Sequence, residues 1–139
     1  MPGKILIIDD EPEAVREMTE FLRRRALDVV GMADPQAALD AIAHDDSLGA
    51  VITDLKMPRI DGFHIIAAAH DRRLAGRLAA VMAVTGHATL EDERRAICSG
   101  ATHFFSKPLK LRAVLKALRD AGIGPQESLA EACRTEASR

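Results

Sequence analysis

The chain has 139 residues, about half of them apolar, which suits one domain with a single packed core. Its 19 lysine and arginine residues nearly balance 21 aspartate and glutamate residues, so neither direct nucleic-acid binding nor a polybasic membrane patch is expected. No apolar run is long enough for a membrane span or a secretory signal, and the two cysteines form no metal-binding motif. We therefore expect a cytoplasmic protein without disulfides or zinc.

Short apolar runs recur along the chain. They predict β-strands at residues 4–8, 28–32, 50–53, 79–84 and 102–105. These runs lack the polar alternation of a half-exposed strand, which is typical of strands that are buried on both faces.

Helical patterns lie between these runs, and most of them have a recognisable start or end. The first begins at Pro12 and carries Val15, Met18, Leu22 and Ala26 at helical spacing. The next three begin at Asp34-Pro35, at Asp61-Gly62 and at Thr89, which precedes Asp92 in a capping-box pattern. The fifth carries apolar residues from 111 to 118 and ends before Gly122.

The order is therefore strand then helix, repeated five times. This order predicts an α/β fold, a doubly wound five-stranded parallel sheet with right-handed crossovers and helices on both faces. We expect this domain to span residues 1–122. Residues 123–139 are mostly polar and are expected to form a C-terminal tail, partly helical or disordered.

Charged and polar side chains follow the predicted strands. Asp9-Asp10-Glu11 follows the first strand, and Asp54, Thr85 and Lys107 follow the third, fourth and fifth. Because parallel strands end at one edge of the sheet, we expect these groups to face one shallow pocket. Carboxylates held close together repel one another, and a hard cation such as Mg²⁺, or alternatively Mn²⁺, relieves that repulsion.

This set of groups suits phosphoryl transfer. A carboxylate can act as the nucleophile and form an acyl phosphate, and Asp54 is the best candidate because it stands alone at a central strand end. Lys107 and a metal ion would neutralise charge on the transferred oxygens, and Thr85 would supply a hydroxyl group. An aspartate at a strand end is usually only a turn or cap residue, so the inference depends on the whole group.

At these residues the chain resembles the receiver domain of bacterial two-component response regulators, over residues 3–121. The segment from Asp54 to Gly62 is similar to the family pattern D-x-x-M-P-x-M-D-G, with Ile60 in place of the usual methionine. The resemblance implies a flavodoxin-like (βα)5 receiver fold and a stand-alone phosphorylation switch. Asp54 would accept a phosphoryl group from a histidine kinase or a histidine phosphotransfer protein.

The resemblance also implies a role for each matched residue. Asp10, Asp54 and the backbone carbonyl of Lys56 would ligate magnesium, and Asp9 would act through a bound water. Lys107 would contact the acyl phosphate, and the peptide bond before Pro108 would be cis. Thr85 and Phe104 would be the switch residues, although Phe104 is equally consistent with ordinary core packing.

The downstream partner is expected to be an unknown protein that is bound by direct contact. A homodimer through the face of the fourth helix, fifth strand and fifth helix is also consistent with the resemblance. Lys56 and His87 hold positions that tune dephosphorylation in the family, and neither is an acid or amide, so we expect a long-lived acyl phosphate.

Several alternatives remain. The chain could be the receiver part of a larger regulator or of a hybrid kinase, although Met1 as a natural start argues mildly against the second. An aspartate-nucleophile phosphatase is disfavoured because Lys56 occupies the place of its second aspartate. A flavin-binding module is disfavoured because the acidic run at residues 9–11 would repel a phosphate.

Two other features have simpler interpretations. Residues 23–25 are consecutive arginines, which we interpret as a solvated face near a helix end. Cys98 lies among alanine and isoleucine and is expected to be a small packing residue.

Overall fold

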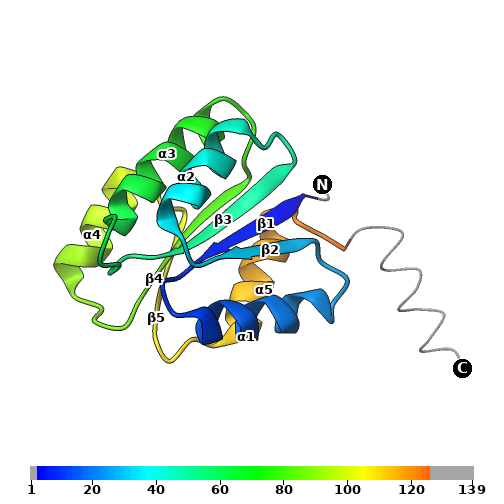
Figure 1. Ribbon diagram of the computed structural model, residues 1–139, viewed down its shortest axis with the longest axis horizontal. Helices are drawn as coiled ribbons and strands as arrows, with labels where there is room; N and C mark the ends of the chain where they lie inside the picture. The colour runs from blue at the N-terminus through cyan, green and yellow to red at the C-terminus, as the bar shows by residue number, and fades with distance from the viewer. Residues whose placement is uncertain (1–2, 126–139) are drawn as a thin grey trace, which may run out of the picture.

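Figure 1 shows the computed structural model of the chain, which describes residues 3–125. Its strands are β1 (Lys4–Ile8), β2 (Val29–Met32), β3 (Leu48–Asp54), β4 (Ala80–Thr85) and β5 (His103–Ser106). Its helices are α1 (Pro12–Arg23), α2 (Pro35–His44), α3 (Gly62–Leu74), α4 (Leu90–Ser99) and α5 (Leu111–Asp120). The strands form one parallel sheet in the order β2-β1-β3-β4-β5, which confirms the predicted doubly wound α/β fold.

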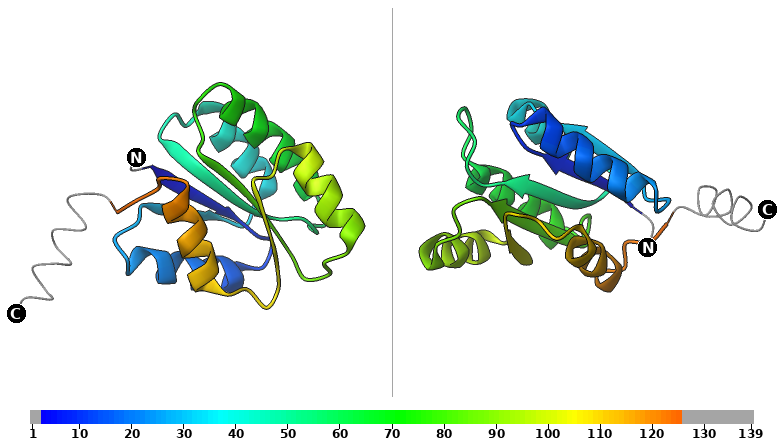
Figure 2. Two further views of the ribbon diagram at one scale, coloured as in Figure 1. Left: turned by 180° about the vertical axis from the view of Figure 1, so that it is seen from behind. Right: turned by 90° about the horizontal axis from the view of Figure 1, so that it is seen from below.

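The sheet separates two apolar cores. Helices α1 and α5 cover one face, and α2, α3 and α4 cover the other (Figures 1 and 2). Along β1, Ile5 and Ile7 belong to the core under α1 and α5, whereas Leu6 and Ile8 belong to the other core. Successive strand residues point to opposite faces, so a continuous apolar run is what a sheet covered on both sides requires.

Local capping accounts for three of the helix starts. The side chain of Asp34 accepts a hydrogen bond from the N–H of Gln36 at 3.1 Å, and Asp61 accepts one from Phe63 at 3.0 Å. The hydroxyl of Thr89 accepts the N–H of Asp92 at 3.0 Å. Each bond satisfies an amide that has no partner within its own helix, so the predicted starts of α2, α3 and α4 are confirmed.

The end of α1 differs from the prediction. Ala26 was expected on the apolar face of the helix, but α1 ends at Arg23 and Ala26 has a left-handed φ of 62°. The N–H of Leu27 bonds the carbonyl of Leu22 at 3.3 Å, and the guanidinium of Arg23 donates to the carbonyl of Val29 at 2.8 Å. These bonds close the helix and turn the chain into β2.

Two further expectations are corrected. Cys98 is exposed, because α4 buries only Ala96 fully and turns its other residues outward or to its edges. Ile123, which was assigned to the tail, has a fully buried side chain in the core beneath α5. The rest of the predicted tail from residue 126 lies outside the described residues. Within residues 3–125 no helix is both long enough and apolar enough to span a membrane.

Candidate functional site

The candidate site lies at the carboxyl ends of β1 and β3, which are neighbours in the sheet. The chain leaves β1 toward β2 on one side, whereas β3 continues the sheet toward β4 on the other. This is the point at which the strand order reverses, where doubly wound sheets form their ligand crevices. Asp9 and Asp10 directly follow β1, and Asp54 is the last residue of β3.

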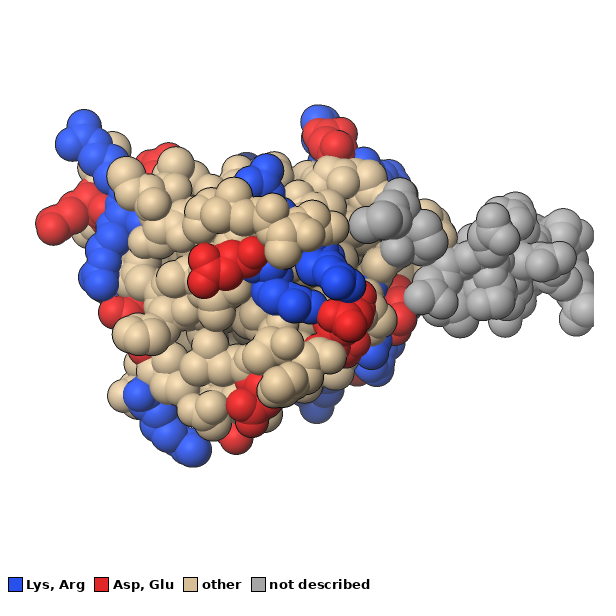
Figure 3. Space-filling view, turned by 90° about the horizontal axis from the view of Figure 1, so that it is seen from above, with Lys and Arg blue, Asp and Glu red and all other residues tan. Residues whose placement is uncertain are grey.

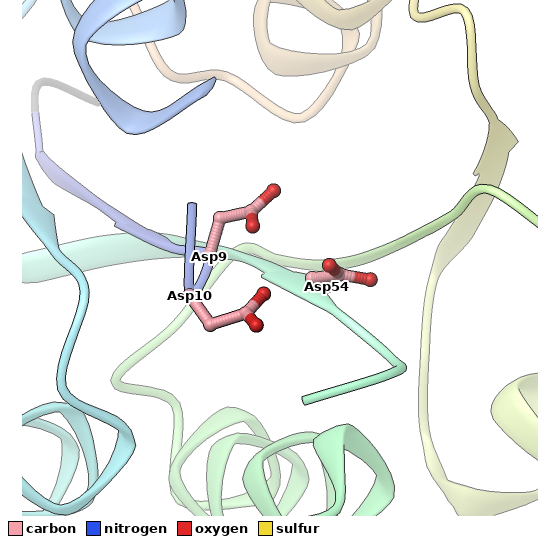
Figure 4. A group of neighbouring side chains, drawn as sticks. All are labelled: Asp9, Asp10 and Asp54. Carbon is pink, nitrogen blue, oxygen red and sulfur yellow. The ribbon is translucent and has the colours of Figure 1, made fainter. Parts of the chain in front are cut away.

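Three carboxylates converge at this point. Asp9, Asp10 and Asp54 each present an oxygen, and these oxygens all lie within 4.8 Å of one another (Figure 4). Asp9 and Asp54 are almost fully buried, whereas Asp10 is more open to solvent. The loops orient two of the three, since the N–H of Glu11 donates to Asp9 at 3.0 Å and that of Lys56 donates to Asp54 at 3.2 Å.

Lys107 joins the carboxylates from β5. Its Nζ lies 3.1 Å from Oδ2 of Asp9 and 3.5 Å from Oδ2 of Asp54. Its backbone N–H donates to the carbonyl of Thr85 at 2.8 Å, which fixes the loop after β5 against the end of β4. The Lys107–Pro108 peptide bond is cis, as the resemblance implied.

The electrostatics of the site favour a bound cation. Burial raises the pKa of Asp54, and the nearby charge of Asp9 adds to that shift, against the opposing hydrogen bond from Lys56 and the charge of Lys107. Burial alone would lower the pKa of Lys107, but its hydrogen bond to Asp9 and the charge of Asp54 outweigh it and raise that pKa. Three carboxylates thus share one lysine, which contacts only Asp9 and Asp54, and this all-oxygen donor set fits a hard divalent ion such as Mg²⁺ or Mn²⁺.

Thr85 is the last residue of β4, and Phe104 lies on the neighbouring strand β5. Thr85 is fully buried, and its hydroxyl accepts the N–H of His87 at 3.3 Å, a long bond. Phe104 pairs in register with Ala83 of β4 and packs, half-buried, against the core beneath α3 and α4. Phe104 therefore packs against the core and also lies on the strand next to that of Thr85.

Side-chain contacts that the sequence did not predict connect the loop after Asp54 to α4. The Nζ of Lys56 lies 3.4 Å from Asp92, and Arg95 lies 3.5 Å from Asp61. The guanidinium of Arg95 also stacks over the ring of Phe63 at 4.0 Å. The capping pattern at Thr89 did point to Asp92, but only as a helix-start residue.

Two hollows border the cluster. Asp9, Asp54 and Lys107 line a pocket of about 290 Å³ between α1 and the start of α5. Asp10 lines a second hollow of about 570 Å³, together with Lys56 and the rest of the loop that leads to α3. Asp9 and Asp10 thus border different hollows while their carboxylates belong to one cluster.

Comparison with known proteins gives a consistent result. The model of the response regulator receiver domain matches residues 5–119. The transcriptional regulatory protein FixJ of Azorhizobium caulinodans is 32% identical over 135 residues, which cover 96% of this chain and 62% of FixJ. The two-component response regulator PprB of Pseudomonas aeruginosa is 28% identical over 114 residues, 82% of this chain and 42% of PprB.

Solved structures agree on the fold. A CheY-like receiver domain protein from Methanospirillum hungatei has a TM-score of 0.76 and 23% identity, with 98% of this chain and 99% of that chain covered. A Burkholderia pseudomallei response regulator, solved with a phosphorylated aspartic acid, a calcium ion and citrate, has a TM-score of 0.74 and 23% identity, with 97% and 73% covered.

The curated relatives are longer than this chain, which spans 42% of PprB and 28% of the regulatory protein FlgR of Helicobacter pylori. The match to the family model nevertheless covers most of the chain and includes every candidate site residue from Asp9 to Lys107. The chain therefore belongs to the response regulator receiver domain family.

Proposed function

We propose that this receiver domain is a phosphorylation-dependent switch in which Asp54 accepts a phosphoryl group from a histidine kinase or a histidine phosphotransfer protein. The observation that carries the proposal is the position of Asp54, whose carboxylate lies within 4.8 Å of two other carboxylate oxygens and 3.5 Å from Lys107. The conformational change that follows phosphorylation is passed on to a downstream target by protein contact.

The transfer needs one nucleophile and several positive charges. An oxygen of Asp54 forms a bond to phosphorus as the bond from phosphorus to the donor breaks. Lys107 releases Asp54 and turns its Nζ toward the transferred oxygens. Asp10, Asp54 and the backbone carbonyl of Lys56 would hold Mg²⁺ (or Mn²⁺), with Asp9 acting through water. When bound, the ion neutralises charge on the phosphoryl group.

The response follows from the long hydrogen bond of Thr85. Its hydroxyl, which accepts the N–H of His87, can instead turn to donate a hydrogen bond to a charged phosphoryl oxygen. Phe104 then moves into the space behind Thr85 and changes the surface of α4, β5 and α5. That surface is our candidate for the target contact or for a homodimer.

The product is expected to persist. A phosphatase of related chemistry needs a carboxylate two residues after the nucleophile, but the residue there is Lys56, whose Nζ is 3.4 Å from Asp92. Neither Lys56 nor His87 is an acid or amide that would orient an attacking water, so we expect a switch with a long-lived acyl phosphate and not a turnover enzyme. The length of the curated relatives also supports the alternative that this receiver works within a larger regulator.

The proposal can be tested with magnesium and acetyl phosphate, or with the beryllofluoride mimic. We expect an added phosphoryl mass on the wild-type protein and on Asp71→Asn, which changes an exposed aspartate on α3. Asp54→Asn should give none. Equal labelling of Asp54→Asn, or no adduct on the wild type, would refute the assignment.

A further inference from the structure

A second charged feature lies on the face of the molecule formed by α1 and α5. The two helices lie side by side there (Figure 2, left). Between the turn that follows α1 and the outer side of α5 is a groove of about 380 Å³, which we call the basic groove. Its lining residues are Arg25, Arg112, Leu115, Lys116, Arg119 and Asp120.

The basic groove is electrostatically unlike the rest of the chain. Four cations and one carboxylate give it a formal charge of +3 (4 − 1), whereas the whole chain carries −2. Lys116 is paired with Asp120 at 2.7 Å. Within residues 3–125, Arg112 and Arg119 have neither an ion pair nor a side-chain hydrogen bond, so two guanidinium groups remain for an external ligand.

On other parts of the surface, basic and acidic side chains are interspersed. Figure 3 shows the side of the molecule that lies at the top of Figure 1, where basic and acidic side chains are neighbours. At the end of α3, for example, Arg72 and the nearby Arg77 both pair with Asp46. The excess of positive charge in the basic groove is therefore a local feature and not a property of the whole surface.

One side of the basic groove is held in place before any ligand binds. The guanidinium of Arg25 stacks over the ring of Phe21 at 3.6 Å and donates to the carbonyl of Phe21 at 2.9 Å. Leu115, which is almost fully buried, forms an apolar floor. An arginine fixed in this way loses little side-chain entropy on binding.

The spacing of the cations indicates the shape of the ligand. Arg112, Lys116 and Arg119 follow the i, i+4, i+7 pattern that places side chains on one helical face, over about 10 Å of α5. Carboxylates at the same spacing on a second helix would meet them in register. The four cations of the groove could neutralise only a few phosphates of a nucleic acid, and Asp120 would repel them.

We propose that the basic groove binds an acidic amphipathic helix of a partner protein. None of the candidate phosphorylation residues lines the groove, so the proposal goes beyond the switch function and can be tested on the unphosphorylated protein. Binding is expected to weaken with salt, because its main contribution comes from exposed charges.

The experiment uses the full chain and two fluorescent helical peptides of identical composition. One carries glutamates at i, i+4 and i+7, and the other distributes them around the helix. Fluorescence anisotropy should show saturable binding of the first peptide, at least about tenfold tighter than the second. Amide NMR shifts should be confined to the turn after α1 and to α5.

The matched variants separate this groove from general charge effects. Arg112→Gln with Arg119→Gln should weaken the peptide by about tenfold, whereas Arg73→Gln with Arg94→Gln, an equal change of charge on other helices, should not. Equal losses in both variants, no preference between the peptides, or tighter binding of duplex DNA or anionic vesicles would each overturn the proposal. Self-association through the groove, detected by sedimentation, would also overturn it.

Discussion

Replacement of Gly62 by alanine tests how closely α3 must approach Asp54, the proposed phosphoacceptor. Gly62 is the first residue of α3, and its N–H bonds the carbonyl of Leu55 at 3.1 Å. A Cβ at this position would lie 2.5 Å from Cα of Leu55, and closer still to the carbonyl oxygen of Asp54. Both neighbours are backbone atoms, so neither can rotate away as a flexible side chain would.

The magnitude follows from this distance. Ordinary contacts of a Cβ begin near 3.4 Å, so the start of α3 or the end of β3 must move by at least about 0.9 Å (3.4 − 2.5) to clear Cα of Leu55, and by more to clear the carbonyl oxygen of Asp54. Overpacking of this kind costs about 1–3 kcal/mol, which lowers Tm by about 4–12 °C in a domain of this size. Ligand distances in a metal site tolerate only about 0.2 Å, so Mg²⁺ affinity should fall by at least about tenfold.

Urea denaturation and calorimetric Mg²⁺ titration of Gly62→Ala measure the two effects. Gly124→Ala is the matched control, because a Cβ there meets no atom within 4 Å. The control should leave both quantities nearly unchanged. If Gly62→Ala has the same stability and Mg²⁺ affinity as the wild type, the start of α3 and the end of β3 are not in the close contact described, and the reasoning fails.

Three further predictions concern the charges of the site. Because burial raises the pKa of Asp54, its ionised form destabilises the metal-free fold. Asp54→Asn should therefore raise Tm at pH 7. This gain in Tm should shrink as pH falls toward the ordinary carboxyl pKa, where the wild-type carboxyl is also neutral. Lys107→Ala leaves Asp9 and Asp54 without their cation, so phosphorylation by acetyl phosphate should slow by at least about tenfold, as rates from intact mass will test. Lys56→Asn supplies an amide that can orient water, so the acyl phosphate measured by loss of label should decay faster than in the wild type; an unchanged lifetime would contradict the role given to Lys56.

Local sequence signals were sufficient for the fold. Aspartate and threonine mark helix starts by capping bonds within three residues, so Asp34, Asp61 and Thr89 could be identified without tertiary information. The continuous apolar runs likewise report burial on both faces of the sheet. The convergence of Asp9, Asp10 and Asp54 followed from topology, because parallel strands end at one edge.

The features that sequence reasoning missed depend on contacts between distant residues. The pairing of Lys56 with Asp92 requires the packing of α4 against the loop after β3, which no local pattern encodes. Ile123 lies beyond the glycine that ends α5, so its burial is decided by the fold of the preceding chain and not by its neighbours in sequence. Ala26 fits the helical period, yet the bonds that close α1 override it.

The candidate site is also where the chain departs most from what folding alone would favour. Burial raises the pKa of Asp54, and the charge of Asp9 adds to that shift, so the lysine shared by Asp9 and Asp54 offsets the cost of the ionised carboxylate only in part. Hydrophobic residues at these strand ends would give a more stable sheet. Binding of a cation at this point therefore relieves the free-energy cost of the buried, ionised carboxylate. The same cost makes the stability of the fold depend on whether the ligand is bound. The burial of Asp54 beside other carboxylates thus accounts both for its cost to stability and for its proposed role as phosphoacceptor.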